Sequence, residues 1–189
     1  ILSCEKESTE PNDNNKNNDP GDTTEKEFFP IDLGYSWTYE VSIDGDYFHD
    51  NTYQVLKDTT VLSVPGTFYQ LNGLLAPGTY QYYGVNADGI FGFTFDGEEF
   101  SDVEIYFKPD VEVGDTYSTF NNQYQVELMS KNESVVVPAG NYECFHYKFV
   151  RSGIETRDYY ISPGTGIVKI QLDSPLTGTI LWELKSKSF

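Results

Sequence analysis

Residues 135–172 decide the fold class, and they read VVVPAGNYECFHYKFVRSGIETRDYYISPGTGIVKIQL. The stretch combines β-branched and aromatic residues with two proline–glycine corners, at 138–140 and 163–164. β-Branched and aromatic side chains fit the pleated surface of a strand, whereas Pro and Gly mark turns. This part of the chain therefore predicts strands joined by tight turns.

A hairpin with a defined register is predicted inside this stretch, with residues 152–154 as a three-residue loop. The expected cross-strand pairs are Phe145–Ile161, Tyr147–Tyr159, Lys148–Asp158 and Arg151–Glu155. Facing aromatic rings and opposite charges stabilise antiparallel strands. A two-residue loop would set Lys148 against Arg157, so the three-residue loop is preferred.

Clean alternation of apolar and polar residues predicts another strand over residues 36–44. Trp37, Tyr39, Val41 and Ile43 share one face, and the residues between them are polar. A period of two indicates a strand with one buried face.

Similar short runs recur along the whole chain, and together they give about eleven or twelve strands. One of these strands is expected at 53–57, and turns are expected at Pro65-Gly66 and at 131–133. The predicted fold class is all-β, an antiparallel meander curled into an open or closed barrel with few or no helices. A length of 189 residues suits one such domain, placed at residues 28–189.

The chain is strongly acidic, with a formal net charge of −18 at pH 7. Nucleic acids and anionic membrane surfaces are bound through clustered Lys and Arg, so neither is an expected partner of this acidic chain. The sequence is also rich in aromatic residues, with 15 Tyr and 13 Phe against one Met.

The first 27 residues predict an anchor and a tether. Ile1-Leu2-Ser3-Cys4 resembles the end of a bacterial lipoprotein signal peptide, the lipobox, which implies a diacylglycerol on Cys4. Residues 5–27 contain no aromatic and no aliphatic residue, so they cannot bury enough surface to fold. We therefore expect a protein attached by lipid to the bacterial cell envelope, facing the periplasm or the exterior. A Cys4–Cys144 disulfide is the alternative if Cys4 is not acylated.

Three motifs carry a resemblance to a family. Residues 34–39 read GYSWTY, residues 137–144 read VPAGNYEC, and residues 160–169 read YISPGTGIVK. In this order they resemble a group of uncharacterised bacterial envelope lipoproteins, although Asn141 stands where Thr is commoner. The resemblance implies a β-domain of unknown function, related in shape to lipoprotein-carrier half-barrels, and it assigns no catalytic residues.

Five aromatic residues are candidate ligand contacts: Trp37, Tyr39, Phe145, Tyr147 and Tyr159. If they line a barrel lumen, they would hold an apolar ligand. If they are exposed on a sheet face, they would stack on sugars or mark a protein-binding patch. The third interpretation is that they fill the core.

Two acidic turns are weak candidates for calcium, one with Asp44, Asp46 and Asp50, the other with Asp96, Glu98 and Glu99. Neither has the spacing of a calcium loop with a terminal Glu, so solvated turns are the preferred interpretation and no metal or other cofactor is predicted.

The two histidines, His49 and His146, lack a metal-binding spacing. We expect His146 to be a hydrogen-bonded structural residue and Cys144 a buried packing residue, with no catalytic residues.

Three functions follow from these observations. The first is a non-enzymatic envelope lipoprotein that binds an apolar ligand or a partner protein. The second is a carbohydrate-binding surface module, and the third is a hydrolase with an acidic site. A continuous apolar cavity would favour the first, exposed aromatic rings the second, and a cleft with a buried carboxyl group the third.

Overall fold

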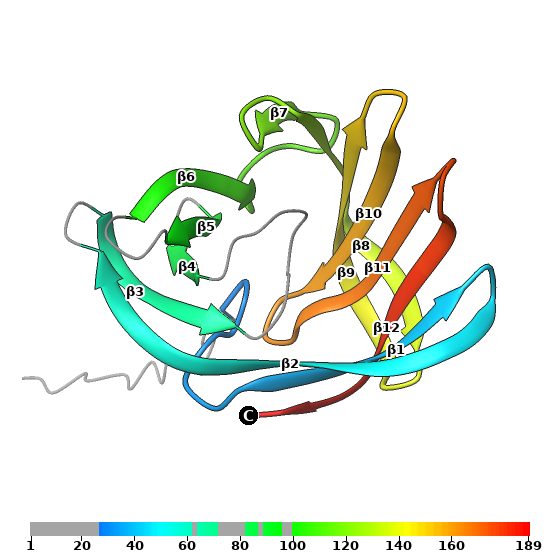
Figure 1. Cartoon of the computed structure of the whole chain (residues 1–189), viewed down its shortest axis with the longest axis horizontal. Coiled ribbons are helices and arrows are strands. Elements are labelled where there is room, and N and C mark those ends of the chain that lie inside the picture. The colour runs from blue at the N-terminus through cyan, green and yellow to red at the C-terminus, as the bar shows by residue number, and fades with distance from the viewer. Residues whose placement is uncertain (1–26, 62–63, 72–81, 87–88, 96–99) are drawn as a thin grey trace, which may run out of the picture.

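Twelve strands form one antiparallel sheet in the described part of the chain (Figure 1). The computed structural model describes residues 27–61, 64–71, 82–86, 89–95 and 100–189. The first six strands are β1 (Ser36–Ile43), β2 (Asp46–Val61), β3 (Val64–Leu71), β4 (Tyr82–Asn86), β5 (Gly89–Phe95) and β6 (Phe100–Phe107). The other six are β7 (Thr116–Thr119), β8 (Tyr124–Val137), β9 (Gly140–Arg151), β10 (Glu155–Ser162), β11 (Gly166–Ser174) and β12 (Gly178–Ser188).

The sheet curls into a nearly closed barrel, which confirms the predicted antiparallel meander (Figure 1). The strand order is β6-β5-β4-β3-β2-β1-β12-β11-β10-β9-β8-β7. Every pair of neighbours is consecutive in the chain except β1 and β12, the first and the last strand. The ends of the sheet are β6 and β7, and no ladder joins them among the described residues. We call this junction the seam.

The hairpin register predicted from the sequence is confirmed. Tyr147 pairs with Tyr159, Lys148 with Asp158, and the loop is closed by Arg151 and Glu155. Gly153 has a φ of +71° in the loop, a conformation that glycine adopts without strain.

Three local predictions were wrong. The turn expected at 131–133 is absent, because β8 runs unbroken from Tyr124 to Val137. Between Leu128 and Glu133 this strand has more residues than the facing part of β9, and its register shifts twice to accommodate them. Pro65-Gly66 lies inside β3, at a point where the pairing with β2 is irregular and a missing amide hydrogen is tolerated. The strand expected at 53–57 is much longer, since β2 pairs first with β1 and then with β3.

The barrel interior is packed with aromatic rings. Phe107 of β6 lies 5.3 Å from Tyr147, 5.4 Å from Phe149 and 5.2 Å from Tyr159, measured between ring centroids in edge-on geometry. Such geometry is favourable for aromatic pairs. The far end of the first six strands thus packs on the face made by β9 and β10.

Polar atoms of the interior rings bond to backbone carbonyls of other strands. Tyr39 Oη donates to the carbonyl of Ile167 at 2.7 Å, and Trp37 Nε1 donates to that of Thr165 at 2.7 Å. Each bond joins β1 to the segment that begins β11. A buried hydroxyl needs such a partner, so these bonds fix the relative placement of the strands.

The segment before β1 covers one end of the barrel. Phe29 is buried and packs on Trp37 at 5.8 Å, while Phe28 meets Phe145 edge-on at 5.1 Å. The carbonyl of Glu27 accepts a hydrogen bond from Gly164 N at 2.8 Å. Among the described residues, no helix has the length and apolar character needed to cross a membrane.

Replacement of Tyr39 by Phe tests the contribution of these interior bonds. The variant leaves the buried carbonyl of Ile167 without its donor, so we expect the free energy of unfolding to fall by about 1–3 kcal/mol. Tyr47→Phe is the matched control, because Tyr47 is 63% exposed whereas Tyr39 is 1% exposed. Urea unfolding followed by tryptophan fluorescence measures both, and equal stability of the two variants would contradict the prediction.

Candidate functional site

Four of the five predicted ligand-contact residues lie in the core. Trp37, Tyr39, Tyr147 and Tyr159 are buried, and they contact other side chains of the interior. Phe145 differs, because it is only partly buried. Contact of these residues with a ligand stays a prediction.

A cleft of about 510 Å³ lies between the β8–β9 hairpin and the turn from β10 to β11, and we call it the hairpin cleft. Its lining mixes aromatic, amide, hydroxyl and charged side chains: Lys131, Asn132, Asn141, Tyr142, Glu143, Phe145, Ser162, Pro163 and Thr165. Phe145 is the one predicted ligand-contact residue among them. A volume in this range and a few convergent polar groups are typical of small-molecule sites.

The walls of the hairpin cleft are tied to the barrel. At the hairpin tip, Ala139 N donates to the carbonyl of Leu184 in β12 at 2.9 Å. On the opposite wall, Lys187 Nζ contacts Thr165 Oγ1 at 3.0 Å. Phe145 meets the ring of Phe28 edge-on. These contacts tie the hairpin tip, Phe145 and the β10–β11 turn to the rest of the barrel.

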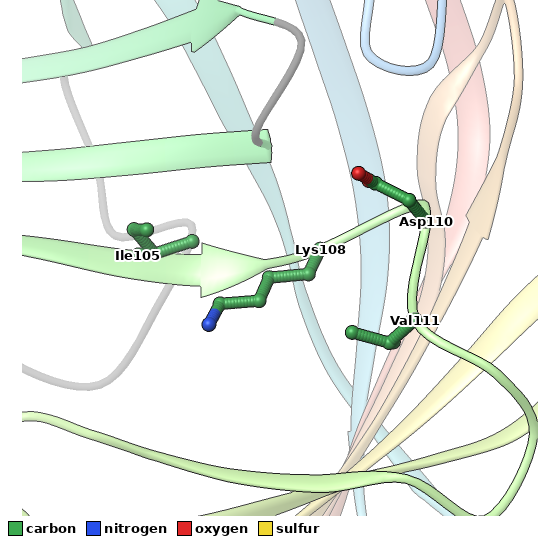
Figure 2. A pocket seen from close by; sticks show the side chains of 4 residues that line it. All are labelled: Ile105, Lys108, Asp110 and Val111. Carbon is green, nitrogen blue, oxygen red and sulfur yellow. The ribbon is translucent and has the colours of Figure 1, made fainter.

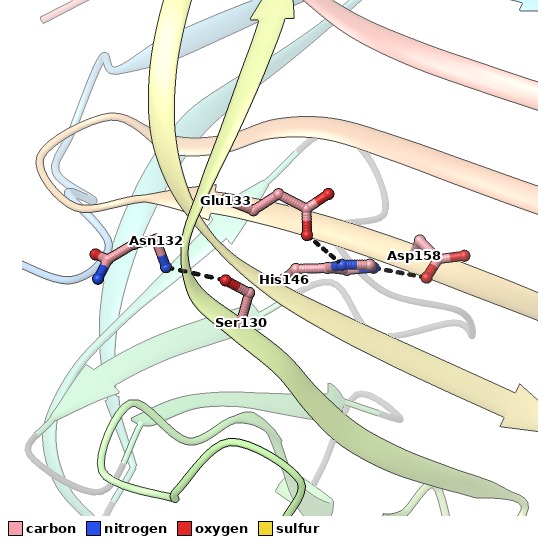
Figure 3. Close-up of polar contacts among 5 residues, drawn as sticks. All are labelled: Ser130, Asn132, Glu133, His146 and Asp158. Carbon is pink, nitrogen blue, oxygen red and sulfur yellow. Dashed lines mark hydrogen bonds and ion pairs between the residues drawn. The ribbon is translucent and has the colours of Figure 1, made fainter.

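Beside this cleft, His146 is held between two carboxylates, and we call Glu133, His146 and Asp158 the histidine cluster (Figure 3). The ring atoms Nδ1 and Nε2 lie 2.7 Å from Glu133 Oε2 and 2.7 Å from Asp158 Oδ1, respectively. The ring of Tyr160 stacks on the imidazole at a centroid distance of 4.4 Å. The cluster therefore links β8, β9 and β10.

The geometry requires a doubly protonated imidazole. A carboxylate accepts hydrogen bonds and donates none, so each ring nitrogen must carry a proton to bond both partners. Burial disfavours the charged ring, but the hydrogen bonds and charges of Asp158 and Glu133 outweigh it and raise the pKa of His146 above 6.5. His146 is thus a structural, hydrogen-bonded residue in this arrangement.

Cys144 lies near the histidine cluster, but the arrangement does not make it a nucleophile. The thiol is fully buried, and burial together with the charges of Glu143 and Glu133 raises its pKa to about 12. Both nitrogens of His146 are already occupied by carboxylates, so neither is free to accept the thiol proton. Nucleophilic catalysis needs a thiolate or an available base, and this group offers neither.

Sequence reasoning missed the histidine cluster. The predicted hairpin register did place Asp158 beside Lys148 and hence close to His146. Glu133 could not be found this way, because two irregularities in β8 bring it opposite Cys144. Regular one-to-one pairing of β8 with β9, which is what alternation in the sequence predicts, does not reveal that shift.

The acidic turn with Asp44, Asp46 and Asp50 is engaged with the protein's own groups. Asp44 Oδ1 accepts from Thr179 N at 2.9 Å, and Asp50 Oδ2 pairs with Lys185 Nζ at 2.8 Å. Within the described ranges, no group of three or more His, Cys, Asp or Glu side chains is arranged to hold a metal ion. The predicted lipid site Cys4 and the second acidic turn at Asp96, Glu98 and Glu99 lie outside the described residues.

A second cleft, of about 290 Å³, lies at the seam and is lined by Ile105, Lys108, Asp110 and Val111 (Figure 2). Side chains bridge the seam here. Tyr117 of β7 donates through its hydroxyl to the carbonyl of Tyr106 at 2.6 Å, and Lys108 Nζ lies 4.7 Å from the Tyr117 ring centroid. Polar groups of this cleft are thus partly used to close the barrel.

No protein-family model and no curated protein matches the chain. Among solved structures, it is similar to an inferred exported protein with a YmcC-like fold from Bacteroides fragilis, with 15% identity and a TM-score of 0.47 over 87% of this chain and 100% of that one. It is also similar to an inferred lipoprotein from Parabacteroides distasonis, with 16% identity and a TM-score of 0.46 over 86% of this chain and 99% of that one.

The histidine cluster predicts a pH-dependent contribution to stability. Because the pKa of His146 is raised on folding, the contribution is complete below about pH 6.5 and is lost as the pH rises through the folded-state pKa. We expect His146→Gln to lower the free energy of unfolding by about 1–3 kcal/mol at low pH, with a smaller difference from the wild type at high pH.

Urea unfolding across this pH range, with the exposed His49 changed to Gln as control, measures the effect. A wild-type advantage over His146→Gln that grows as the pH rises would contradict the assignment of a charged ring.

Proposed function

We propose that this chain is a non-catalytic, lipid-anchored protein of the bacterial cell envelope that binds neutral oligosaccharides in the hairpin cleft. The observation that carries the proposal is the lining of the cleft, where two aromatic side chains lie among amide, hydroxyl and charged groups. Sugars present both apolar C–H faces and many hydroxyls, so they are bound by rings together with directional polar groups.

The charge of the protein favours a neutral glycan over an acidic one. The formal net charge is −18, so a polyanionic chain would be repelled as it approaches. Lys131 and Glu143 place one charge of each sign in the cleft. Asn132 and Asn141 add amide groups that can pair with the N-acetyl amides of a sugar. Chitotetraose, which carries such amides, is therefore the first probe.

Binding outside the barrel accounts for the described residues better than carriage of an apolar molecule inside it. Phe107 packs on Tyr147, Phe149 and Tyr159 across the interior. The hydroxyl of Tyr147 is bonded to the carbonyl of Lys108 at 2.8 Å. The interior rings are therefore in contact with one another, whereas Tyr142 and Phe145 line an open cleft.

Hydrolysis is less well supported by the described site. Cys144 is not activated, and both nitrogens of His146 are bonded to carboxylates. The pKa of Glu27 is raised by burial and by Asp32, but Glu27 is not among the residues that line the hairpin cleft.

The lipid anchor is tested at Cys4. In a bacterial host that processes lipoproteins, we expect the full precursor to incorporate a palmitate analogue and to appear in the membrane fraction. Cys4→Ser removes the thiol that would take the diacylglycerol, so the label should be lost. Cys144→Ser is the control and should keep the label. Labelling of the Cys4→Ser protein would exclude the proposed anchor.

Calorimetry with chitotetraose, cellotetraose and maltotetraose tests the glycan site. We expect chitotetraose to bind, and Phe145→Ala and Asn141→Ala to weaken it by about tenfold each, which corresponds to roughly 1.4 kcal/mol. Asn141 is exposed at the hairpin, so its variant leaves the core unchanged.

Tyr47→Ala is the matched control, because it removes an exposed ring outside the cleft. Absence of binding by all three sugars, or equal weakening by Tyr47→Ala, would overturn the proposed site.

A further inference from the structure

The histidine cluster and the hairpin cleft share the same stretches of chain. Lys131 and Asn132, which line the cleft, directly precede Glu133 in β8. Phe145, which also lines it, directly precedes His146 in β9. At most two peptide bonds therefore separate residues of the cluster from residues that line the cleft.

We propose that protonation of His146 regulates the hairpin cleft, so that the cleft binds its ligand when the ring is charged and loses affinity when the ring is neutral. The identity of the ligand rests on the proposed function. The coupling between the ring and the cleft rests on the geometry of the histidine cluster alone.

The two carboxylates will not respond equally when the ring loses a proton. A neutral imidazole keeps one N–H, so only one of the two hydrogen bonds can persist. The side chain of Asp158 is 15% exposed, and that of Glu133 is 40% exposed. Leaving the more buried carboxylate without a donor costs more, so the proton stays on Nε2 toward Asp158. The lone pair of Nδ1 then faces Glu133, and this carboxylate turns to water.

The segment that carries Glu133 is the least regular part of β8. Between Leu128 and Glu133 the register against β9 shifts twice, so this segment lacks a continuous ladder. Ser130 Oγ accepts a bond from Asn132 N at 3.1 Å, which holds the segment only locally (Figure 3). The segment is paired with β9 at Ser130–His146 and Glu133–Cys144, and Lys131 Nζ lies 3.7 Å from Glu112 Oε2. The link from Glu133 to His146 is a side-chain contact that adds to these pairs, and its loss loosens the backbone at Lys131 and Asn132.

Other titratable groups lie on the strands around His146. Cys144 on β9 and Tyr160 on β10 each have a pKa raised to about 12, in both cases chiefly by burial. Lys148 lies opposite Asp158 and Glu127 in register, and Lys169 on β11 pairs with Glu183 at 3.3 Å. His146 is the group here whose ordinary pKa lies near neutrality.

Nuclear magnetic resonance on the full chain tests the coupling without a ligand. With His49→Gln as background, the one remaining histidine ring signal reports His146 between about pH 5 and about pH 10. We expect the amide signals of Lys131 and Asn132 to shift with the same midpoint.

Glu133→Gln and Asp158→Asn each remove a negative charge, so each should lower the midpoint of the His146 ring titration. In Asp158→Asn, which keeps Glu133, the amide signals should follow to the lower midpoint. Amide signals of Lys131 and Asn132 that do not shift at the midpoint of the His146 ring titration would overturn the inference.

Chitotetraose affinity at about pH 6 and about pH 9 gives the second arm. We expect the wild type to bind on the order of tenfold more weakly at the higher pH, and His146→Gln to show the same affinity at both. Equal wild-type affinity at both values, with His146 titrating between them, overturns the regulation and leaves the proposed function standing. If chitotetraose binds at neither pH, the proposed function fails, and the amide titration alone decides the coupling.

Discussion

The pairing of the first strand with the last is the interaction on which the architecture depends. β1 and β12 are antiparallel from Ser36–Ser188 to Ile43–Ile180. This ladder joins one meander, β2 to β6, with another, β7 to β11, and gives them a common interior. Without it, each half would be an open sheet with an apolar face in water. The aromatic core, in which Phe107 of β6 packs on β9 and β10, is shared by the two halves that are held together here.

The barrel is closed on its other side by a different kind of contact. At the seam, side-chain hydroxyls replace the backbone ladder: Tyr117 reaches the carbonyl of Tyr106, and Tyr147 reaches that of Lys108. Phe107 adds ring contacts with β9 and β10. One junction is therefore made by the main chain and the other by tyrosines, which explains why a chain rich in aromatic residues can form a nearly closed barrel without a full circle of hydrogen bonds.

Local pairing was predictable from the sequence, whereas long-range pairing was not. The alternation at Trp37 and Tyr39 predicted a buried face, and opposite charges at Lys148 and Asp158 fixed the hairpin register. The β1–β12 ladder pairs residues 36–43 with residues 180–188, so no short-range turn or hairpin pattern in the sequence predicts it. The site was harder still, since Glu133 reaches His146 only through irregularities in β8 that no alternation pattern predicts. Of the predicted ligand contacts, Phe145 alone lines the hairpin cleft.

The pairing of the start of β1 with the end of β12 has a topological consequence. Because Ser36 lies opposite Ser188, a short linker could join the ends of the folded domain, and the chain could be opened instead at residues 108–115, where no ladder crosses the seam in the described structure. The strands would then run β7 to β12 followed by β1 to β6, each beside its predecessor. The fold is thus related by circular permutation to a simple up-and-down arrangement, with its first and last strands placed in the middle of the sheet rather than at its edges.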